Sequence, residues 1–105
     1  MLTHSNLEAI RDRYGKEYLL RQLAEECGEL SVAALHLIRA DRKETKLTKE
    51  EVVDNLIEEV ADVIVMIDCV LRTAVSKDGR VLVNRTIEAK CHRMVRNLLG
   101  GEDDA

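Results

Sequence analysis

Two clusters of carboxylates stand within apolar stretches of the sequence. The first is EECGEL, residues 25–30, and the second is EEVAD, residues 58–62. On a helix, side chains three residues apart lie about 60° apart around the axis and one turn along it, so two such carboxylates can reach one point. Carboxylate oxygens suit hard divalent cations, with Mg²⁺ as the first candidate and Mn²⁺ as the second.

The spacing within the clusters favours a metal site over two solvated helix faces. Glu26 and Glu29 form one i, i+3 pair, Glu59 and Asp62 form another, and Asn55 shares the side of the second pair. Like charges at this spacing destabilise a helix, and their burial is costly unless a cation neutralises them. A solvated face normally interleaves basic residues, but residues 25–38 and 54–71 contain no Lys or Arg. Taken singly, each acid can still be only a solvated residue.

The elements that must position these acids are expected to be helices. The chain has no Pro, and its β-branched residues follow helical periodicity, which predicts an all-α fold. Ser5 with Glu8, and Thr48 with Glu51, are capping-box patterns. Four helices are expected, at about 5–14, 16–39, 48–75 and 81–99, with Gly15 breaking or bending the first and SKDG forming a turn before the last.

The second of these helices is expected to bury one stripe and the chain to form one domain. The stripe consists of Leu20, Leu23, Ala24, Cys27, Leu30, Ser31, Ala34 and Ile38. A single all-α domain is predicted over residues 1–99, followed by a disordered acidic tail over 100–105. A chain of 105 residues is short for a core that also encloses a substrate cavity, which favours oligomerisation.

Composition excludes several classes of function. The net charge of −4 argues against binding to a nucleic-acid backbone. No segment is apolar enough to span a membrane, and no secretory signal is present. The three cysteines are odd in number and widely spaced, and no CxxC or CxxH pair suggests zinc, so they are interpreted as reduced core thiols of a cytoplasmic protein.

The paired acidic motifs resemble those of a known superfamily. The E-x-x-E … E-x-x-D arrangement, within LLRQLAEECGEL and EEVADVIVMIDCVL, is similar to that of the all-α nucleoside triphosphate pyrophosphohydrolases, the MazG-like superfamily. IEAKCHRMVRNL, with its Lys-x-x-Arg pattern, resembles the end of such chains. The resemblance covers about residues 14–99. It implies a four-helix bundle that assembles as a dimer or tetramer, and Mg²⁺ held by Glu26, Glu29, Glu59 and Asp62.

The same resemblance implies an activity and roles for further residues. Family members cleave a nucleoside triphosphate between the α and β phosphates, giving the monophosphate and pyrophosphate. Glu25 and Glu58, the first acids of the two clusters, are candidates to orient or deprotonate the attacking water, or are solvated residues. Substrate contacts are predicted for Gln22, His36, Asn55, Lys90 and Arg93. For His36 a structural role, and for Arg93 a solvated face near a helix C-terminus, are the alternatives.

The sequence therefore predicts a cytoplasmic, Mg²⁺-dependent nucleoside triphosphate pyrophosphohydrolase, in which Mn²⁺ can replace Mg²⁺. The chain is expected to form a homodimer or homotetramer and to bind neither nucleic acid nor membrane. Two alternatives remain. One keeps the fold and makes phosphoribosyl-ATP the substrate. The other is a helical oligomerisation module that binds metal or nucleotide without turnover.

Overall fold

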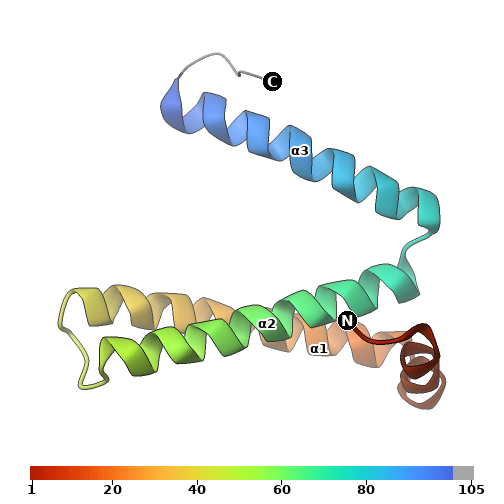
Figure 1. The fold of residues 1–105 in the computed structure, drawn as a ribbon, viewed down its shortest axis with the longest axis horizontal. Helices are drawn as coiled ribbons and strands as arrows, with labels where there is room; N and C mark the ends of the chain where they lie inside the picture. The colour runs from red at the N-terminus through yellow and green to blue at the C-terminus, as the bar shows by residue number, and fades with distance from the viewer. Residues whose placement is uncertain (101–105) are drawn as a thin grey trace. The chain divides into compact units, whose positions relative to one another are not determined.

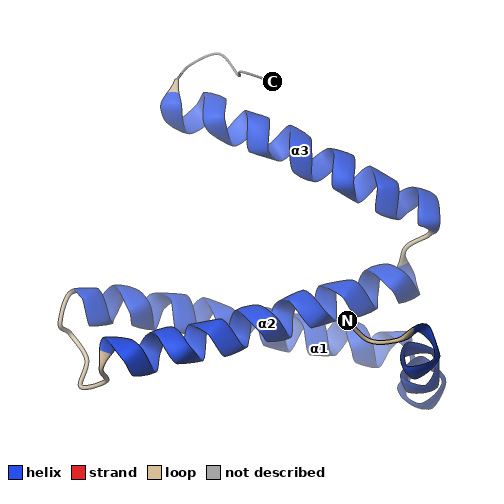
Figure 2. Ribbon diagram, viewed as in Figure 1, coloured by secondary structure: helices blue, strands red, loops and turns tan. Residues whose placement is uncertain are grey.

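The computed structural model describes residues 1–100, and these residues form three helices and no strand (Figures 1 and 2). The helices are α1, His4–Asp41, α2, Lys49–Ala74, and α3, Lys77–Leu99. The all-α prediction is confirmed. The chain divides into two compact units, Met1–Ala74 with α1 and α2, and a second that begins at Val75 and contains α3. The single domain over 1–99 remains a prediction, and the predicted tail after Gly100 lies outside the described residues.

The described residues form three helices where four were expected, because the first two expected helices are joined into one element that is kinked at Gly15. Gly15 has φ 86° and ψ 166°, which is not a helical conformation, yet the helix continues on both sides of it within α1. Glycine adopts a positive φ without the steric cost that a Cβ would impose. The segment before Gly15 therefore turns away from the axis of the rest of α1 (Figure 1).

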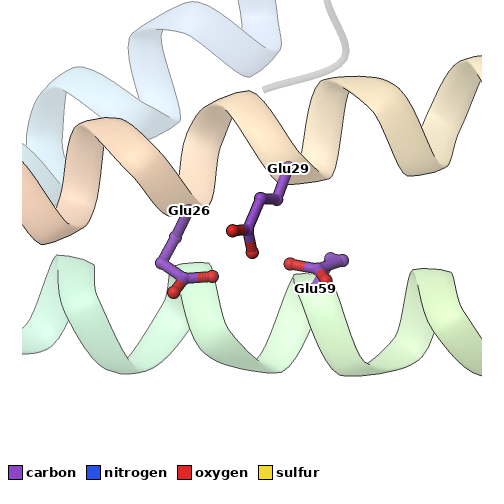
Figure 3. A group of neighbouring side chains, drawn as sticks. All are labelled: Glu26, Glu29 and Glu59. Carbon is purple, nitrogen blue, oxygen red and sulfur yellow. The ribbon is translucent and has the colours of Figure 1, made fainter.

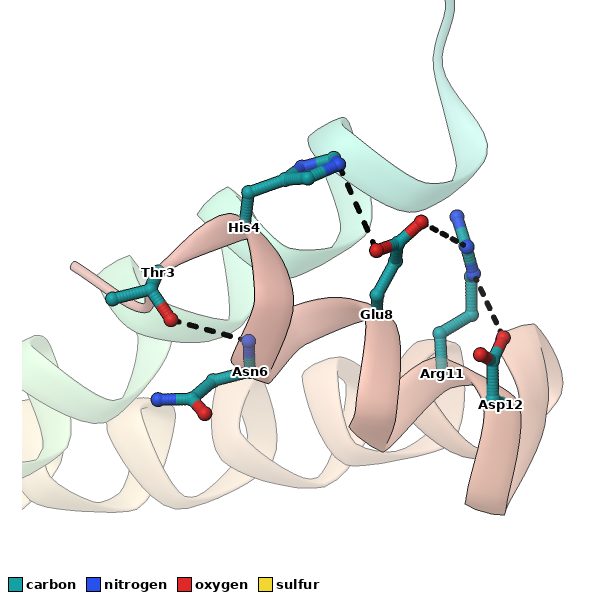
Figure 4. Close-up of polar contacts among 6 residues, drawn as sticks. All are labelled: Thr3, His4, Asn6, Glu8, Arg11 and Asp12. Atoms are coloured by element: carbon teal, nitrogen blue, oxygen red, sulfur yellow. Dashed lines mark hydrogen bonds and ion pairs between the residues drawn. The ribbon is translucent and has the colours of Figure 1, made fainter.

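The N-cap of α1 lies two residues before Ser5, where the predicted capping box begins. The N-cap is Thr3, whose hydroxyl accepts a hydrogen bond of 3.1 Å from the backbone N–H of Asn6 (Figure 4). Glu8 does not close a box there. Instead its carboxylate lies 4.0 Å from the His4 imidazole and 3.6 Å from the guanidinium of Arg11. These exposed ion pairs contribute little to stability.

The capping box predicted for α2 is confirmed. The backbone N–H of Glu51 donates to the Thr48 hydroxyl at 3.1 Å, and the Thr48 N–H donates to the Glu51 carboxylate at 3.2 Å. The SKDG segment, expected to be a turn, instead begins α3. Ser76 is the N-cap of that helix and accepts a hydrogen bond of 3.0 Å from the Gly79 N–H. Side-chain caps therefore define where both helices begin.

Helices α1 and α2 run antiparallel and pack against each other as a hairpin (Figure 1). Buried and half-buried side chains recur at alternating steps of four and three residues along both helices, as in a coiled coil. We call this set the inner seam: Leu19, Leu23, Glu26, Leu30, Ala33 and Leu37 on α1, and Val52, Leu56, Glu59, Val63, Met66 and Val70 on α2. One glutamate on each helix thus takes a position that the pattern reserves for an apolar side chain.

The buried stripe predicted for α1 is largely wrong, because the helix is rotated relative to that expectation. Of the predicted stripe, Leu23 and Leu30 are half-buried, whereas its other members are exposed. The exposed members follow the same four-three spacing, and an exposed row on α2 does so too. We call these residues the outer seam: Leu20, Ala24, Cys27, Ser31, Ala34 and Ile38 on α1, and Ile57, Val60, Ile64 and Ile67 on α2.

The N-terminal segment packs on the end of the hairpin. The guanidinium of Arg72 donates a hydrogen bond of 2.8 Å to the backbone carbonyl of Leu2 and pairs with the Asp68 carboxylate at 3.0 Å. An apolar cluster lies beside it, formed by the buried Leu7, Leu19 and Cys69 with Leu2, Ile10, Met66 and Val70 packed against them. These contacts fix the direction that the chain takes before the Gly15 kink.

Helix α3 belongs to the second unit and contains no buried residue. It ends with Gly100 in the left-handed conformation at φ 67°, and the Gly100 N–H donates to the Arg96 carbonyl at 3.1 Å. Among the helices of residues 1–100, none has the length and apolar composition needed to cross a bilayer.

Candidate metal centre

Three of the four predicted metal ligands converge between α1 and α2. Glu26 and Glu29 extend from α1 and Glu59 extends from α2 toward the same space (Figure 3). One carboxylate oxygen from each of the three residues lies within 4.8 Å of the others. We call these residues the acidic triad. Oxygens at this separation can coordinate one divalent cation after small side-chain rotations, since ligand oxygens lie about 2.0–2.6 Å from Mg²⁺ or Ca²⁺.

The inner seam explains why the triad assembles. Glu26 lies between Leu23 and Leu30 in the seam of α1, and Glu59 lies between Leu56 and Val63 in the seam of α2. Apolar side chains on both sides of each glutamate pack against the facing helix and hold α1 and α2 close together. The carboxylates of Glu26 and Glu59 must therefore share the space between the two helices. Glu29 adds the third carboxylate one turn after Glu26. The hairpin thus supplies the antiparallel packing that the sequence required for convergence.

Two oxygens of the triad are buried without a partner. Glu26 Oε2 and Glu59 Oε2 are both inaccessible to solvent and accept no hydrogen bond within residues 1–100. None of the ion pairs found among those residues involves the triad or Asp62. A buried carboxylate oxygen without a donor loses the hydration that it has in water. A cation bound between the helices would replace that hydration, so these oxygens fit the donor set of a hard metal ion.

The electrostatics of the triad favour a neutralising species. Burial raises the pKa of Glu26 above its ordinary value of 4.5, and the charges of Glu29 and Asp62 raise it further. Burial also raises the pKa of Glu59, followed by the charge of Glu29 and a hydrogen bond shared with it. A raised carboxyl pKa means that the deprotonated form is less favourable in this site than it is in water. Either a proton or a divalent cation bound at these carboxylates would relieve the repulsion, and the two would compete.

Asp62, the fourth predicted ligand, lies beside the triad and is not a member of it. Its side chain is exposed, and its charge nevertheless contributes to the raised pKa of both Glu26 and Glu59. The carboxylate therefore acts on the same site electrostatically. Its role as a ligand stays a prediction.

A groove of about 460 Å³ opens beside the triad, and it is lined by Glu29 and Glu59 but not by Glu26. Two of the predicted functional residues, Glu25 and Asn55, line it together with Glu29 and Glu59. The Gln22 amide donates a long hydrogen bond of 3.4 Å to the Glu25 carboxylate, which places Gln22 next to the groove. These residues meet because all of them occupy neighbouring turns of the two helices that form the hairpin.

Two groove residues escaped the sequence analysis, Gly28 and Val32. A Cβ added to Gly28 would meet no atom within 4 Å, so this position leaves open space beside the acids. Both residues follow from helical spacing, since Gly28 directly precedes Glu29 and Val32 lies one turn beyond it. Counting turns from the acidic positions would have found them.

The remaining predicted residues do not line the groove, and two of them lie in the other unit. Glu58 is exposed and His36 is half-buried, and neither lines the groove. Lys90 and Arg93 lie on α3, where both line a separate surface hollow with Met94, Asn97 and Leu98. Their roles toward water, base or phosphate stay predictions.

The cysteines do not form a metal site within the described residues. Cys69 is buried in the apolar cluster, and burial together with the charge of Asp68 raises the pKa of its thiol. Cys27 and Cys91 are exposed, so the prediction that all three are core thiols is wrong for these two. All three are free thiols.

No family model, curated protein or solved structure matches this chain. The likeness to the MazG-like superfamily therefore rests on the acidic motifs and the sequence around them.

Proposed function

We propose that this protein is a Mg²⁺-dependent nucleoside triphosphate pyrophosphohydrolase of the MazG-like superfamily. It would hydrolyse its substrate between the α and β phosphates, giving a nucleoside monophosphate and pyrophosphate. The observation that carries the proposal is the acidic triad, in which two helices bring together three carboxylates and leave two of their oxygens buried without a partner. The E-x-x-E and E-x-x-D motifs supply the link to a phosphate-cleaving family.

Four carboxylates would hold the ion. Glu26, Glu29 and Glu59 present their oxygens to one space, and Asp62 stands next to them. Mn²⁺ would substitute, because it accepts the same oxygen ligands. When bound, the ion neutralises negative charge on the phosphate oxygens of the substrate.

Glu25 is the favoured group for handling the attacking water. It lines the groove beside the triad, and the Gln22 amide holds its carboxylate. In the proposed reaction, Glu25 takes a proton from water while the water oxygen bonds to one phosphorus of the α–β anhydride. The bond from that phosphorus to the bridging oxygen breaks, and the other phosphate group leaves with that oxygen. Glu58 is the alternative base.

The predicted substrate contacts lie in both units. Asn55 lines the groove beside Glu59, within reach of a ligand bound there. Lys90 and Arg93 present cations at the hollow on α3 and would neutralise phosphate charge. His36 would contact the nucleoside end of the substrate.

The outer seam supports the proposed assembly into a dimer or tetramer. A cytoplasmic location is a separate part of the proposal and does not rest on the seam. Members of the outer seam on α2 include Ile57 and Ile64, which are 61% and 50% exposed, and they repeat at the spacing that the inner seam uses for packing. Two hairpins joined along this seam would bury it in a four-helix bundle.

The test is pyrophosphate release from a panel of the common ribonucleoside and deoxyribonucleoside triphosphates, each with Mg²⁺ and with Mn²⁺. We expect release from at least one of them, and a loss of about 100-fold or more in Glu29→Gln, whose helical content should be unchanged. Asp54→Asn is the matched control, because Asp54 is an exposed acid on α2 that does not line the groove. If wild-type protein released no pyrophosphate from any of these nucleotides, the catalytic proposal would be rejected in favour of a non-catalytic binding module.

A further inference from the structure

The segment before Gly15 is held to the hairpin by few contacts. We call residues 1–14 the N-terminal strap. Leu7 is its one buried residue, and Leu2, Ile10 and Arg11 are half-buried, whereas the other ten residues of the strap are exposed. The hairpin, by contrast, packs along the inner seams of two long helices. Local opening begins where buried contacts are few, so the strap should open at a lower cost than the hairpin unfolds.

The strap covers the thiol of Cys69 on α2. Leu7 packs with Leu19 and Cys69, and Leu2 and Ile10 pack against these three residues. In this arrangement Cys69 is only 2% exposed. Removal of the strap would therefore bring the thiol into contact with solvent, which makes Cys69 a natural reporter of where the strap lies.

Arg72 ties the strap to α2 through a polar contact. Its guanidinium donates a hydrogen bond of 2.8 Å to the backbone carbonyl of Leu2, and the Asp68 carboxylate, 3.0 Å away, holds the guanidinium in place. The polar contacts drawn in Figure 4 all lie within the strap itself, so they can persist when the strap moves as one body.

The backbone at Gly15 allows α1 a second conformation. Its φ of 86° and ψ of 166° are values that essentially only glycine adopts. Glycine also adopts helical values, as Gly28 does in the same helix. The residues on both sides of Gly15 are already helical, and the chain has no Pro to prevent a continuous helix. A rotation at Gly15 alone would thus make α1 straight and carry the strap away from Cys69.

The kink also creates a cavity of about 260 Å³ at this end of the hairpin. Leu2, Ile10 and Tyr14 line it from the strap, and Met66 and Cys69 line it from α2. With α1 straight, the strap would no longer supply its part of the lining. The cavity is therefore a property of the kinked conformation.

We propose that α1 is a two-state element, with Gly15 as its hinge and Arg72 as its latch. In the closed state, which the structure shows, Gly15 is kinked and the strap covers Cys69. In the open state Gly15 is helical, α1 is straight, and the apolar cluster around Cys69 faces solvent. Such a pair of conformations differs mainly at one hinge residue, as in other hinge motions. The device is independent of the proposed catalytic activity.

Thiol labelling with Ellman's reagent measures the opening. Cys27 and Cys91 are exposed, so replacing both with Ser leaves Cys69 as the single thiol and its reaction as the signal. We expect Cys69 to react at least about tenfold faster than the globally unfolded fraction, taken from urea denaturation, allows. Urea should accelerate the reaction only weakly, because opening of the strap exposes little surface. A reaction that follows global unfolding would overturn the proposal.

Two glycine variants, made in this single-thiol protein, test the hinge. Gly15→Ala should shift α1 toward the open state, because a Cβ is disfavoured at φ 86° and accepted in a helix. Cys69 should then react about tenfold faster, with no loss of helical content by circular dichroism. Gly28→Ala is the matched control, since an added Cβ meets no atom within 4 Å at either glycine. Equal rates in the two variants, or a loss of helix in Gly15→Ala, would refute the hinge.

A pair of arginine variants tests the latch. Arg72→Met removes the donor to the Leu2 carbonyl and keeps a long apolar stem, so Cys69 should react about fivefold faster. Arg21→Met is the control, because Arg21 forms a comparable i, i+4 ion pair, 2.7 Å from Glu17, and that pair lies outside the strap. If Arg72→Met labelled no faster than Arg21→Met, Arg72 would not be the latch and the proposal would fall.

Discussion

Glu26 and Glu59 occupy equivalent places on opposite sides of the α1–α2 hairpin. Each is the acidic member of the inner seam of its own helix, and each keeps its Oε2 buried without a hydrogen-bond partner. A coiled-coil seam normally carries apolar side chains at these positions. The hairpin is therefore less stable at its centre than it would be with apolar residues at these two positions. We propose that these glutamates are present because they bind a cation.

Removing one charge from the triad should stabilise the metal-free protein. In Glu59→Gln the amide keeps the shape of the side chain and ends its repulsion with Glu29 and Asp62. We expect the melting temperature, measured by circular dichroism in EDTA, to rise by a few degrees. Asp54→Asn, an exposed acid on the same helix, should change it much less. A lower melting temperature in Glu59→Gln would contradict the repulsion that we infer.

The stability of the metal-free protein should depend on pH through Glu26 and Glu59. Their pKa values are raised in the folded state, so that state binds protons more tightly than the unfolded chain does. The resulting stabilisation is fully present below the ordinary carboxyl pKa of 4.5 and is lost as pH rises through the raised values.

We therefore expect these two residues to favour folding increasingly as pH falls from about 7 to about 5. The measurement is urea denaturation in EDTA across this range. The double variant Glu26→Gln with Glu59→Gln should lose this part of the pH dependence. Equal pH profiles for the two proteins would show that the triad titrates normally.

Mg²⁺ should stabilise the folded protein, because a ligand that binds only the folded state shifts the equilibrium toward it. At a concentration of about 100 times the Kd the gain is about 2.7 kcal/mol. EDTA should reverse the gain, and Glu29→Gln should largely lack it. Acidification should weaken it, since protons compete with the ion for the carboxylates. Isothermal titration calorimetry with Mn²⁺ measures the affinity of the ion. If Glu29→Gln gave the same binding heat as the wild type, the ion would bind at another site.

A charge in the outer seam should prevent self-association. Ile64 is 50% exposed in the protomer, so Ile64→Lys should leave the hairpin folded while placing an ammonium group in the interface. Light scattering should then report a protomer of 11.9 kDa, whereas the wild type should give a multiple of that mass. Leu47→Lys, in the α1–α2 connection, should assemble like the wild type. A wild-type mass of one protomer would reject the proposed assembly.

The capping box at the start of α2 should contribute measurably to stability. Thr48→Ala removes the hydroxyl that accepts the Glu51 N–H and should lower the free energy of unfolding by about 1 kcal/mol. Lys46→Ala, two residues earlier in the exposed connection, is the control. Urea denaturation measures both, and equal midpoints for Thr48→Ala and Lys46→Ala would show that the box is dispensable.

Local chemistry decided the features that could be predicted from sequence. Thr48 and Glu51 cap α2 as expected, because a capping box needs only a few neighbouring residues. The i, i+3 spacing likewise placed Glu26 and Glu29 on one side of α1 before any packing was known. Gly15 was expected to break or bend a helix. Whether a glycine breaks or only bends a helix depends on the tertiary contacts of the segments on its two sides. Here the segment before Gly15 is held by Leu7 and Ile10, which pack in the cluster around Cys69.

The sequence by itself determined an all-α chain whose two acidic motifs are separated by a connection short enough for a hairpin. Only the tertiary structure decided which face of α1 meets α2. Two apolar rows share the four-three spacing on each helix, so periodicity alone could not choose between them. Packing chose the row that contains Glu26 and Glu59, and this choice brought the carboxylates together, left the outer seam exposed, and opened a cavity at the kink. Such choices depend on contacts between residues distant in the chain, which no local pattern encodes.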